Sequence, residues 1–90
     1  NMIGVSEAFT LASKYGISQK TFFEISSKSS GSSWAMLNHL PIKGIVKTAA
    51  ANNGFKPGYA AKLILIDLSI AKQMAKKISL SMIIIIFIVI

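Results

Sequence analysis

One long helix, predicted over residues 57–77, constrains the fold of this chain more than any other stretch. Pro57 suits the first turn of a helix, and after Gly58 no glycine or proline interrupts the run to Lys77. A projection at about 100° per residue gathers polar side chains into one narrow sector. This sector holds an apolar residue, Ile66, between its polar members: Lys62, Ser69, Gln73 and Lys76.

Asp67 projects from the other side of this helix, where its neighbours are apolar. A carboxylate in apolar surroundings is costly unless it is hydrogen-bonded or paired, so the sequence predicts a dedicated partner for a buried Asp67. Two interpretations stay open: a structural hydrogen bond to a loop or another helix, or a group that faces a ligand. The expected neighbours are Ala60, Leu63, Ile64, Ile70, Ala71 and Met74.

Three shorter helices are predicted before the long one. Apolar spacing indicates a helix over residues 3–15 that ends at Gly16, with Val5, Ala8, Phe9, Ala12 and Tyr15 on its core face. Ser18 is expected to cap a second helix over 19–28, with Phe22, Phe23 and Ile25 on its core side. Ser32 or Ser33 is expected to cap a short third helix, which ends at Pro41. Residues 41–57 are predicted to be irregular, so the fold class is all-α.

The composition excludes several kinds of site. The chain has 90 residues, which fits one domain or part of one, and no cysteine, which excludes a disulfide scaffold and a cysteine-based zinc site. One histidine and three acids also make a metal site a poor expectation, and nothing supports Ser–His–Asp chemistry. The net charge of +7 comes entirely from lysine and is interpreted as a solvated surface. Without arginine, nucleic acid is not an expected partner.

The apolar end of the chain, residues 82–90, differs from everything before it. It is far shorter than the roughly 20 residues that span a bilayer, so it suggests a buried strand or an aggregation-prone end. The alternative function is a small cationic membrane-associated protein, which would use this tail beside Lys72, Lys76 and Lys77. The expected localisation is cytoplasmic.

Several short motifs follow one another in a distinctive order: Glu7-Ala8, Tyr15-Gly16-Ile17, Ser29-Ser30-Gly31-Ser32-Ser33-Trp34, Asn52 to Tyr59, and Leu63 to Leu68. Their order and spacing resemble the C-terminal helical domain of 3-hydroxyisobutyrate dehydrogenases, within the β-hydroxyacid dehydrogenase family. The likeness extends from residue 2 to about 81. It implies a helical domain like that of 6-phosphogluconate dehydrogenase-like enzymes, over residues 1–81, with 82–90 as a divergent tail that resembles a read-through or frameshifted end.

The resemblance also implies an activity. Enzymes of this family oxidise a small 3-hydroxy acid to a semialdehyde with NAD, in valine degradation. A Rossmann domain binds the cofactor, a lysine acts as general acid/base, and the helical domain closes the cleft and makes a dimer. The present sequence contains no Gly-x-Gly-x-x-Gly, so the Rossmann domain is expected to be absent from it. The catalytic lysine of the family pattern is expected to be absent too, and the fragment is expected to be inactive alone.

Three residues of this chain are implied as cofactor-contacting. Tyr59 matches a family aromatic beside the cleft, and Asp67 matches in identity, with the structural role favoured for it. Ile66 stands where the family has a lysine that faces the cofactor, and isoleucine cannot donate a hydrogen bond. No catalytic or metal-binding residue is assigned. The expected partner is a second copy of the chain or a separate Rossmann domain.

Overall fold

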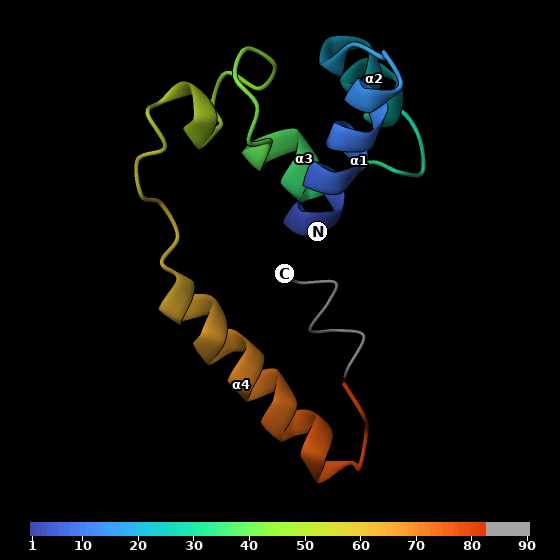
Figure 1. Ribbon diagram of the computed structural model, residues 1–90. Coiled ribbons are helices and arrows are strands. Elements are labelled where there is room, and N and C mark those ends of the chain that lie inside the picture. Colours follow the sequence, from blue (N-terminus) through green and yellow to red (C-terminus); the bar gives the residue numbers. More distant parts are fainter. Residues whose placement is uncertain (83–90) are drawn as a thin grey trace. The chain divides into compact units, whose positions relative to one another are not determined.

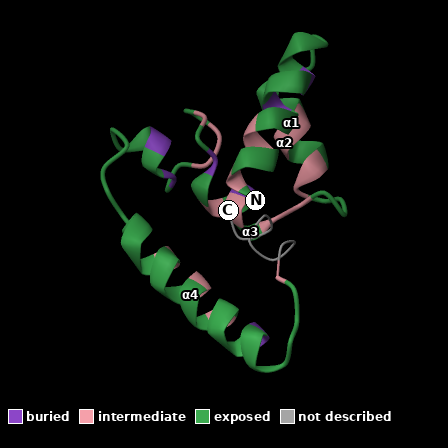
Figure 2. Cartoon of the chain, turned by 60° about the horizontal axis from the view of Figure 1, so that its bottom comes forward, coloured by how far each residue is buried: buried purple, intermediate pink, exposed green. Residues whose placement is uncertain are grey.

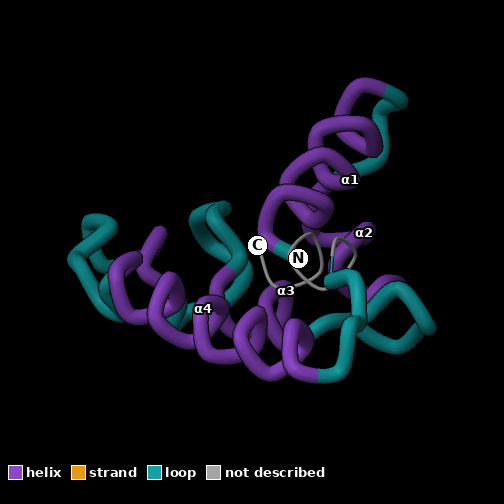
Figure 3. Tube along the Cα trace, turned by 90° about the horizontal axis from the view of Figure 1, so that it is seen from below, coloured by secondary structure: helices purple, strands orange, loops and turns teal. Residues whose placement is uncertain are grey.

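The computed structural model describes residues 1–82, and within them the chain is built from helices and loops without a strand (Figure 3). The all-α prediction is therefore confirmed for the described residues. The chain divides into two compact units, with the boundary between Lys56 and Pro57. Unit 1 contains helices α1, α2 and α3 and the short 3-10 helix η1, and unit 2 contains helix α4 (Figure 1).

Helix α1 spans Met2–Lys14 and ends as predicted, at a glycine. Gly16 has a φ of 80°, a left-handed conformation that costs residues with a Cβ more than it costs glycine. The Ile17 amide donates to the Ala12 carbonyl at 3.0 Å, and the Gly16 amide donates to the Ser13 carbonyl at 3.1 Å. These two bonds form a Schellman motif, which satisfies carbonyls that the helix end leaves without partners.

Serine caps set the starts of the next two helices. Ser18 accepts a bond from the Thr21 amide at 3.1 Å, and α2 then runs over Gln19–Ser26. Of the two serines predicted to cap the third helix, Ser33 is the one that does so, by accepting from the Met36 amide at 3.1 Å. Helix α3 spans Trp34–His39 and stops before Pro41, as the sequence predicted.

The core of unit 1 forms where α1 packs against α2 and α3. Phe9, Met36 and Leu40 are almost fully buried, and the rings of Phe9 and Phe22 meet edge to face with centroids 4.7 Å apart. Such a pair contributes about 0.5–1.5 kcal/mol beyond the burial of its area. Five further partly buried side chains pack around this centre: Val5, Phe23, Ile42, Ile45 and Val46.

Three side chains expected in the core are exposed instead. Tyr15, Ile25 and Ala8 lie on the surface of unit 1, although their spacing matched the apolar faces of α1 and α2. Because α1 contacts α2 and α3 around Phe9, residues at the edges of the predicted faces stay in solvent.

The side chain of Asn52 links two parts of the irregular segment before unit 2. The Asn52 side chain accepts from the Gly44 amide at 2.8 Å and donates to the Val46 carbonyl at 2.6 Å. Asn52 belongs to the 3-10 helix η1, Ala50–Asn52, so these bonds tie the loop over residues 44–46 to η1. The prediction of an irregular segment is confirmed, with η1 as its only helical turn among the described residues.

Helix α4 spans Ala61–Lys77 and begins four residues later than predicted. Pro57 is not its first turn, because Gly58 has poor helix propensity and Ala60 is still extended, with a ψ of 134°. No side chain caps this start. Most of α4 is exposed (Figure 2), including Leu63, Ile70 and Met74 on the face predicted to be apolar and covered.

The predicted apolar tail lies almost entirely outside the described residues, which end at Met82. The alternative of a membrane-associated protein depends on this tail, so it also concerns residues outside the described part. Within residues 1–82, none of the helices combines the length and the hydropathy of a membrane span. All ten lysines are exposed, as expected for a solvated charged surface.

The Schellman end of α1 gives a direct test of this account. Gly16→Ala should lower the free energy of unfolding by about 1 kcal/mol, because alanine is strained at a φ of 80°. Gly4→Ala is the matched control: Gly4 lies inside α1, and a Cβ there meets nothing within 4 Å. This control should raise stability by about 0.5–1 kcal/mol, since alanine favours a helix interior. Urea unfolding followed by circular dichroism measures both, and changes of equal sign would contradict the assignment.

Candidate functional site

Two of the three predicted site residues are joined by a hydrogen bond. The Tyr59 hydroxyl donates to Asp67 Oδ2 over 2.7 Å, a short distance expected when the acceptor is charged. Tyr59 lies at a bend in the segment that precedes α4, and Asp67 lies on the second turn of the helix. The predicted dedicated partner of Asp67 is therefore confirmed, and it is a side chain of the same unit.

The expected burial of Asp67 is wrong, because its side chain is exposed. Helical spacing showed correctly which residues share its face, but it could not show whether another element covers that face. The neighbouring Ile70 and Met74 are 52% and 65% exposed. The carboxylate therefore keeps contact with water and does not carry the desolvation cost from which its partner was inferred.

The bond to Asp67 changes the acidity of the tyrosine. It raises the pKa of the Tyr59 phenol above its ordinary value of 10.0, since the hydrogen bond favours the protonated phenol; partial burial and the charge of Asp67 act in the same direction. Tyr59 thus stays a neutral donor throughout the physiological range. Its proton is directed at the carboxylate, which retains further lone pairs for other donors.

Ile66 lies next to Asp67 in sequence, on the exposed polar stripe of α4. Its side chain is 53% exposed, and Lys62, Ser69 and Gln73 of the same stripe are exposed too. Ser69 donates its hydroxyl back to the Leu65 carbonyl at 2.7 Å, so this hydroxyl is engaged within the helix. The structure therefore places an exposed apolar side chain within the polar stripe of α4, as the helical projection predicted.

The part of the chain that the structure describes provides no cluster of metal ligands around these residues. Within residues 1–82, no three His, Asp or Glu side chains come close enough to hold a metal ion. His39, the one histidine, instead packs edge to face against Trp34 of the same helix, with ring centroids 4.9 Å apart. Unit 1 has a small cavity of about 180 Å³ and unit 2 a larger one of about 480 Å³, and neither includes Tyr59, Ile66 or Asp67.

The sequence interpretation missed that Tyr59 is the partner of Asp67. Tyr59 was predicted to line a pocket, whereas the bond to the acid spans eight positions and starts outside the helix. The neighbour rules for a helix apply to residues three or four apart, so they could not connect these two. The available signal was a phenol close to the start of a helix that carries a single acid.

Comparison with known proteins assigns this helical chain to a family. Residues 1–87 match the family described as "NAD-binding of NADP-dependent 3-hydroxyisobutyrate dehydrogenase". The chain therefore belongs to the NAD-binding domains of 3-hydroxyisobutyrate dehydrogenases, and the cofactor expected from the resemblance, NAD, is confirmed. This NAD-binding family matches residues 1–87 directly, although these residues contain no Gly-x-Gly-x-x-Gly.

Individual relatives agree with this family. A probable 3-hydroxyisobutyrate dehydrogenase of Mycobacterium bovis is 41% identical over 69 residues, which are 77% of this chain and 24% of that protein. The mitochondrial 3-hydroxyisobutyrate dehydrogenase of Drosophila melanogaster is 39% identical over 83% of this chain and 23% of its own length. An NAD-dependent L-serine dehydrogenase of Pseudomonas aeruginosa is 35% identical over 83% of this chain and 25% of its own length.

A solved structure extends the comparison to the fold. The 3-hydroxyisobutyrate dehydrogenase of Mycobacterium tuberculosis, solved with L-serine, matches 89% of this chain and 28% of its own, with a TM-score of 0.74 and 35% identity. This chain thus spans about a quarter of the length of the curated relatives that it matches.

The Tyr59–Asp67 bond predicts a measurable titration. In a Tyr15→Phe background Tyr59 is the remaining tyrosine, and absorbance at 295 nm should show a pKa above 10.0. Asp67→Asn should lower this pKa toward its ordinary value, while Glu24→Gln, which removes an acid that does not contribute to the shift, should leave it unchanged. Because the pKa is raised on folding, the stability from this bond is complete below about pH 10 and is lost as pH rises through the raised pKa. An equal pKa in all three proteins would contradict the bond.

Proposed function

We propose that this chain is the C-terminal helical domain, over residues 1–81, of an NAD-dependent 3-hydroxyisobutyrate dehydrogenase-like oxidoreductase. In this role it would close the substrate cleft and contribute to dimerisation, and the complete enzyme would oxidise a 3-hydroxy acid to a semialdehyde. The observation that carries the proposal is the Tyr59–Asp67 bond on an exposed face of α4, within a chain of an NAD-binding family. The helical architecture of the described residues supports the placement in a helical domain.

Each candidate residue has a role that its chemistry allows. The Asp67 carboxylate accepts hydrogen bonds only, so it suits the ribose hydroxyls or the carboxamide N–H groups of NAD. Tyr59, 62% exposed and fixed by its bond to Asp67, offers an aromatic face beside these groups. Ile66 supplies apolar contact where the related enzymes have a lysine, so the cofactor loses a charged donor at this position.

NAD supplies the hydride chemistry, and the residues of this chain position and contact it. A dinucleotide-binding domain and a general acid/base lysine would come from outside residues 1–90, in a second domain or a partner subunit. We propose a cytoplasmic oligomer with no nucleic-acid partner. The 90-residue chain alone should show no NADH formation at 340 nm with NAD and 3-hydroxyisobutyrate, and clear turnover would contradict this division of roles.

A chimera tests the role of Ile66. The segment of the Mycobacterium bovis relative that aligns with this chain is replaced by the segment of this chain that contains α4. In this chimera Ile66→Lys should lower the KM for NAD about tenfold, because a hydrogen bond involving a charged group contributes about 1.5–3 kcal/mol. The measurement is NADH formation at 340 nm over a range of NAD concentrations.

The control for this experiment separates a specific contact from general attraction. NAD is anionic, so any added lysine on α4 could lower the KM slightly. Met74→Lys adds the same charge at a position that is 65% exposed and lies about two turns further along α4. If Met74→Lys lowers the KM as much as Ile66→Lys, the assignment of position 66 to the cofactor is wrong.

A further inference from the structure

The cavity of unit 2, which is larger than the one described in unit 1, lies where the chain reverses direction after α4. Its volume of about 480 Å³ is in the range of about 300–1,000 Å³ that small-molecule pockets occupy. It shares no residue with Tyr59, Ile66 or Asp67, so an argument about it does not depend on the proposed function. The residues that line it are Lys72, Ala75, Lys76, Ser79, Leu80, Ser81 and Met82.

A second Schellman motif builds this cavity. The Leu80 amide donates to the Ala75 carbonyl at 2.9 Å, and the Ser79 amide donates to the Lys76 carbonyl at 3.2 Å. Ser79 occupies the left-handed position with a φ of 56°, where glycine would avoid the strain. The reversal brings Leu80 back beside Ala75, which is 5% exposed, and creates an apolar wall against the last turn of the helix.

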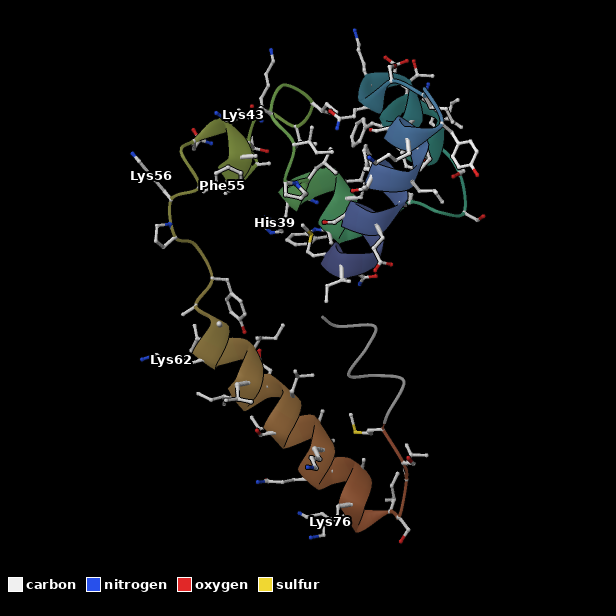
Figure 4. All side chains as sticks on the ribbon, in the orientation of Figure 1. His39, Lys43, Phe55, Lys56, Lys62 and Lys76 are labelled. Carbon is white, nitrogen blue, oxygen red and sulfur yellow. The ribbon has the colours of Figure 1, made fainter. Side chains whose placement is uncertain are left out.

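The lining combines cations with apolar groups. Lys72 and Lys76 are four residues apart and therefore project from the same side of α4. Their ammonium groups are donors only, and the hydroxyls of Ser79 and Ser81 are donors as well as acceptors. The side chains of Leu80 and Met82 supply flexible apolar surface. Figure 4 labels Lys76 at this end of α4 and Lys62 near the opposite end.

From this combination we infer that the cavity binds an anionic amphiphile, a medium-chain carboxylate whose acid group meets Lys72 and Lys76. The C-terminal end of a helix carries partial negative charge, which opposes an anion and offsets part of the attraction of the lysines. A bare inorganic anion therefore gains little at this position. A ligand with an apolar body gains the burial of its chain against Leu80 and Met82 as well.

Octanoate is the probe for this site. It is titrated below its micelle concentration into the 15N-labelled 90-residue chain, and the amides of Ser79, Leu80 and Ser81 are followed by NMR. Saturable shifts at these amides are expected. Propionate, which lacks five methylene groups, should bind at least tenfold more weakly, because each buried methylene contributes about 0.8 kcal/mol. Octanol, which lacks the charge, should bind more weakly than octanoate.

Lysine variants test the charged part of the site. Lys72→Gln and Lys76→Gln should each weaken octanoate binding by about two- to fivefold, the effect of an exposed ion pair. Lys62→Gln is the matched control, since it removes an exposed lysine of the same helix that does not line the cavity. Far-UV circular dichroism should show the same helix content in all three proteins.

Four outcomes would overturn the inference. The first is a set of amide shifts that do not saturate with octanoate, and the second is equal binding of octanoate and inorganic phosphate. The third is equal weakening of octanoate binding by Lys62→Gln and Lys72→Gln. The fourth is a set of shifts at these amides that appear with phosphatidylglycerol vesicles but not with octanoate. The second would reduce the site to an anion site, and the third would show general charge attraction. The fourth would assign the lysines to a membrane surface.

Discussion

The buried contact of Phe9 with Phe22, Met36 and Leu40 is the interaction on which the organisation of unit 1 depends. It joins three helices that are each too short to be stable alone, since isolated helices below about 12–15 residues are marginal in water. The caps at Ser18 and Ser33 and the Schellman motif at Gly16 orient these helices so that their aromatic and aliphatic residues meet. Unit 1 therefore combines local backbone signals with one small core.

Unit 2 is organised differently, because several bonds outside the backbone ladder of α4 lie near the ends of this helix. At its start the Tyr59 hydroxyl bonds to Asp67, and at its end the amides of Ser79 and Leu80 return to the last turn. Between these points the helix presents both a polar stripe and exposed apolar side chains. We propose ligands for two features, the Tyr59–Asp67 pair and the cavity after α4. The first lies near the start of the helix and the second at its end.

The sequence predicted those parts of the fold that depend on local chemistry. Gly16, Ser18 and Pro41 act on the backbone within a few residues, so their effects can be derived without a structure. The exposure of Ile25 and Asp67 and the start of α4 could not be derived in the same way. Burial depends on which element covers a face, and periodicity identifies the face without identifying its cover. The odd position of Ile66 was predictable, because it required only the order of residues along one helix.

The exposure of Asp67 changes the meaning of its bond to Tyr59. A buried carboxylate would need a partner to offset desolvation, but an exposed carboxylate is already solvated by water. At the surface such a bond adds little stability, so rescue of a buried charge does not explain it. The bond does fix an exposed tyrosine ring and directs a carboxylate outward beside Ile66. Of the two interpretations left open by the sequence, the bond from Tyr59 is the structural one, a hydrogen bond between α4 and the loop before it. The remaining lone pairs of the exposed carboxylate are what the proposed contact with a ligand would use.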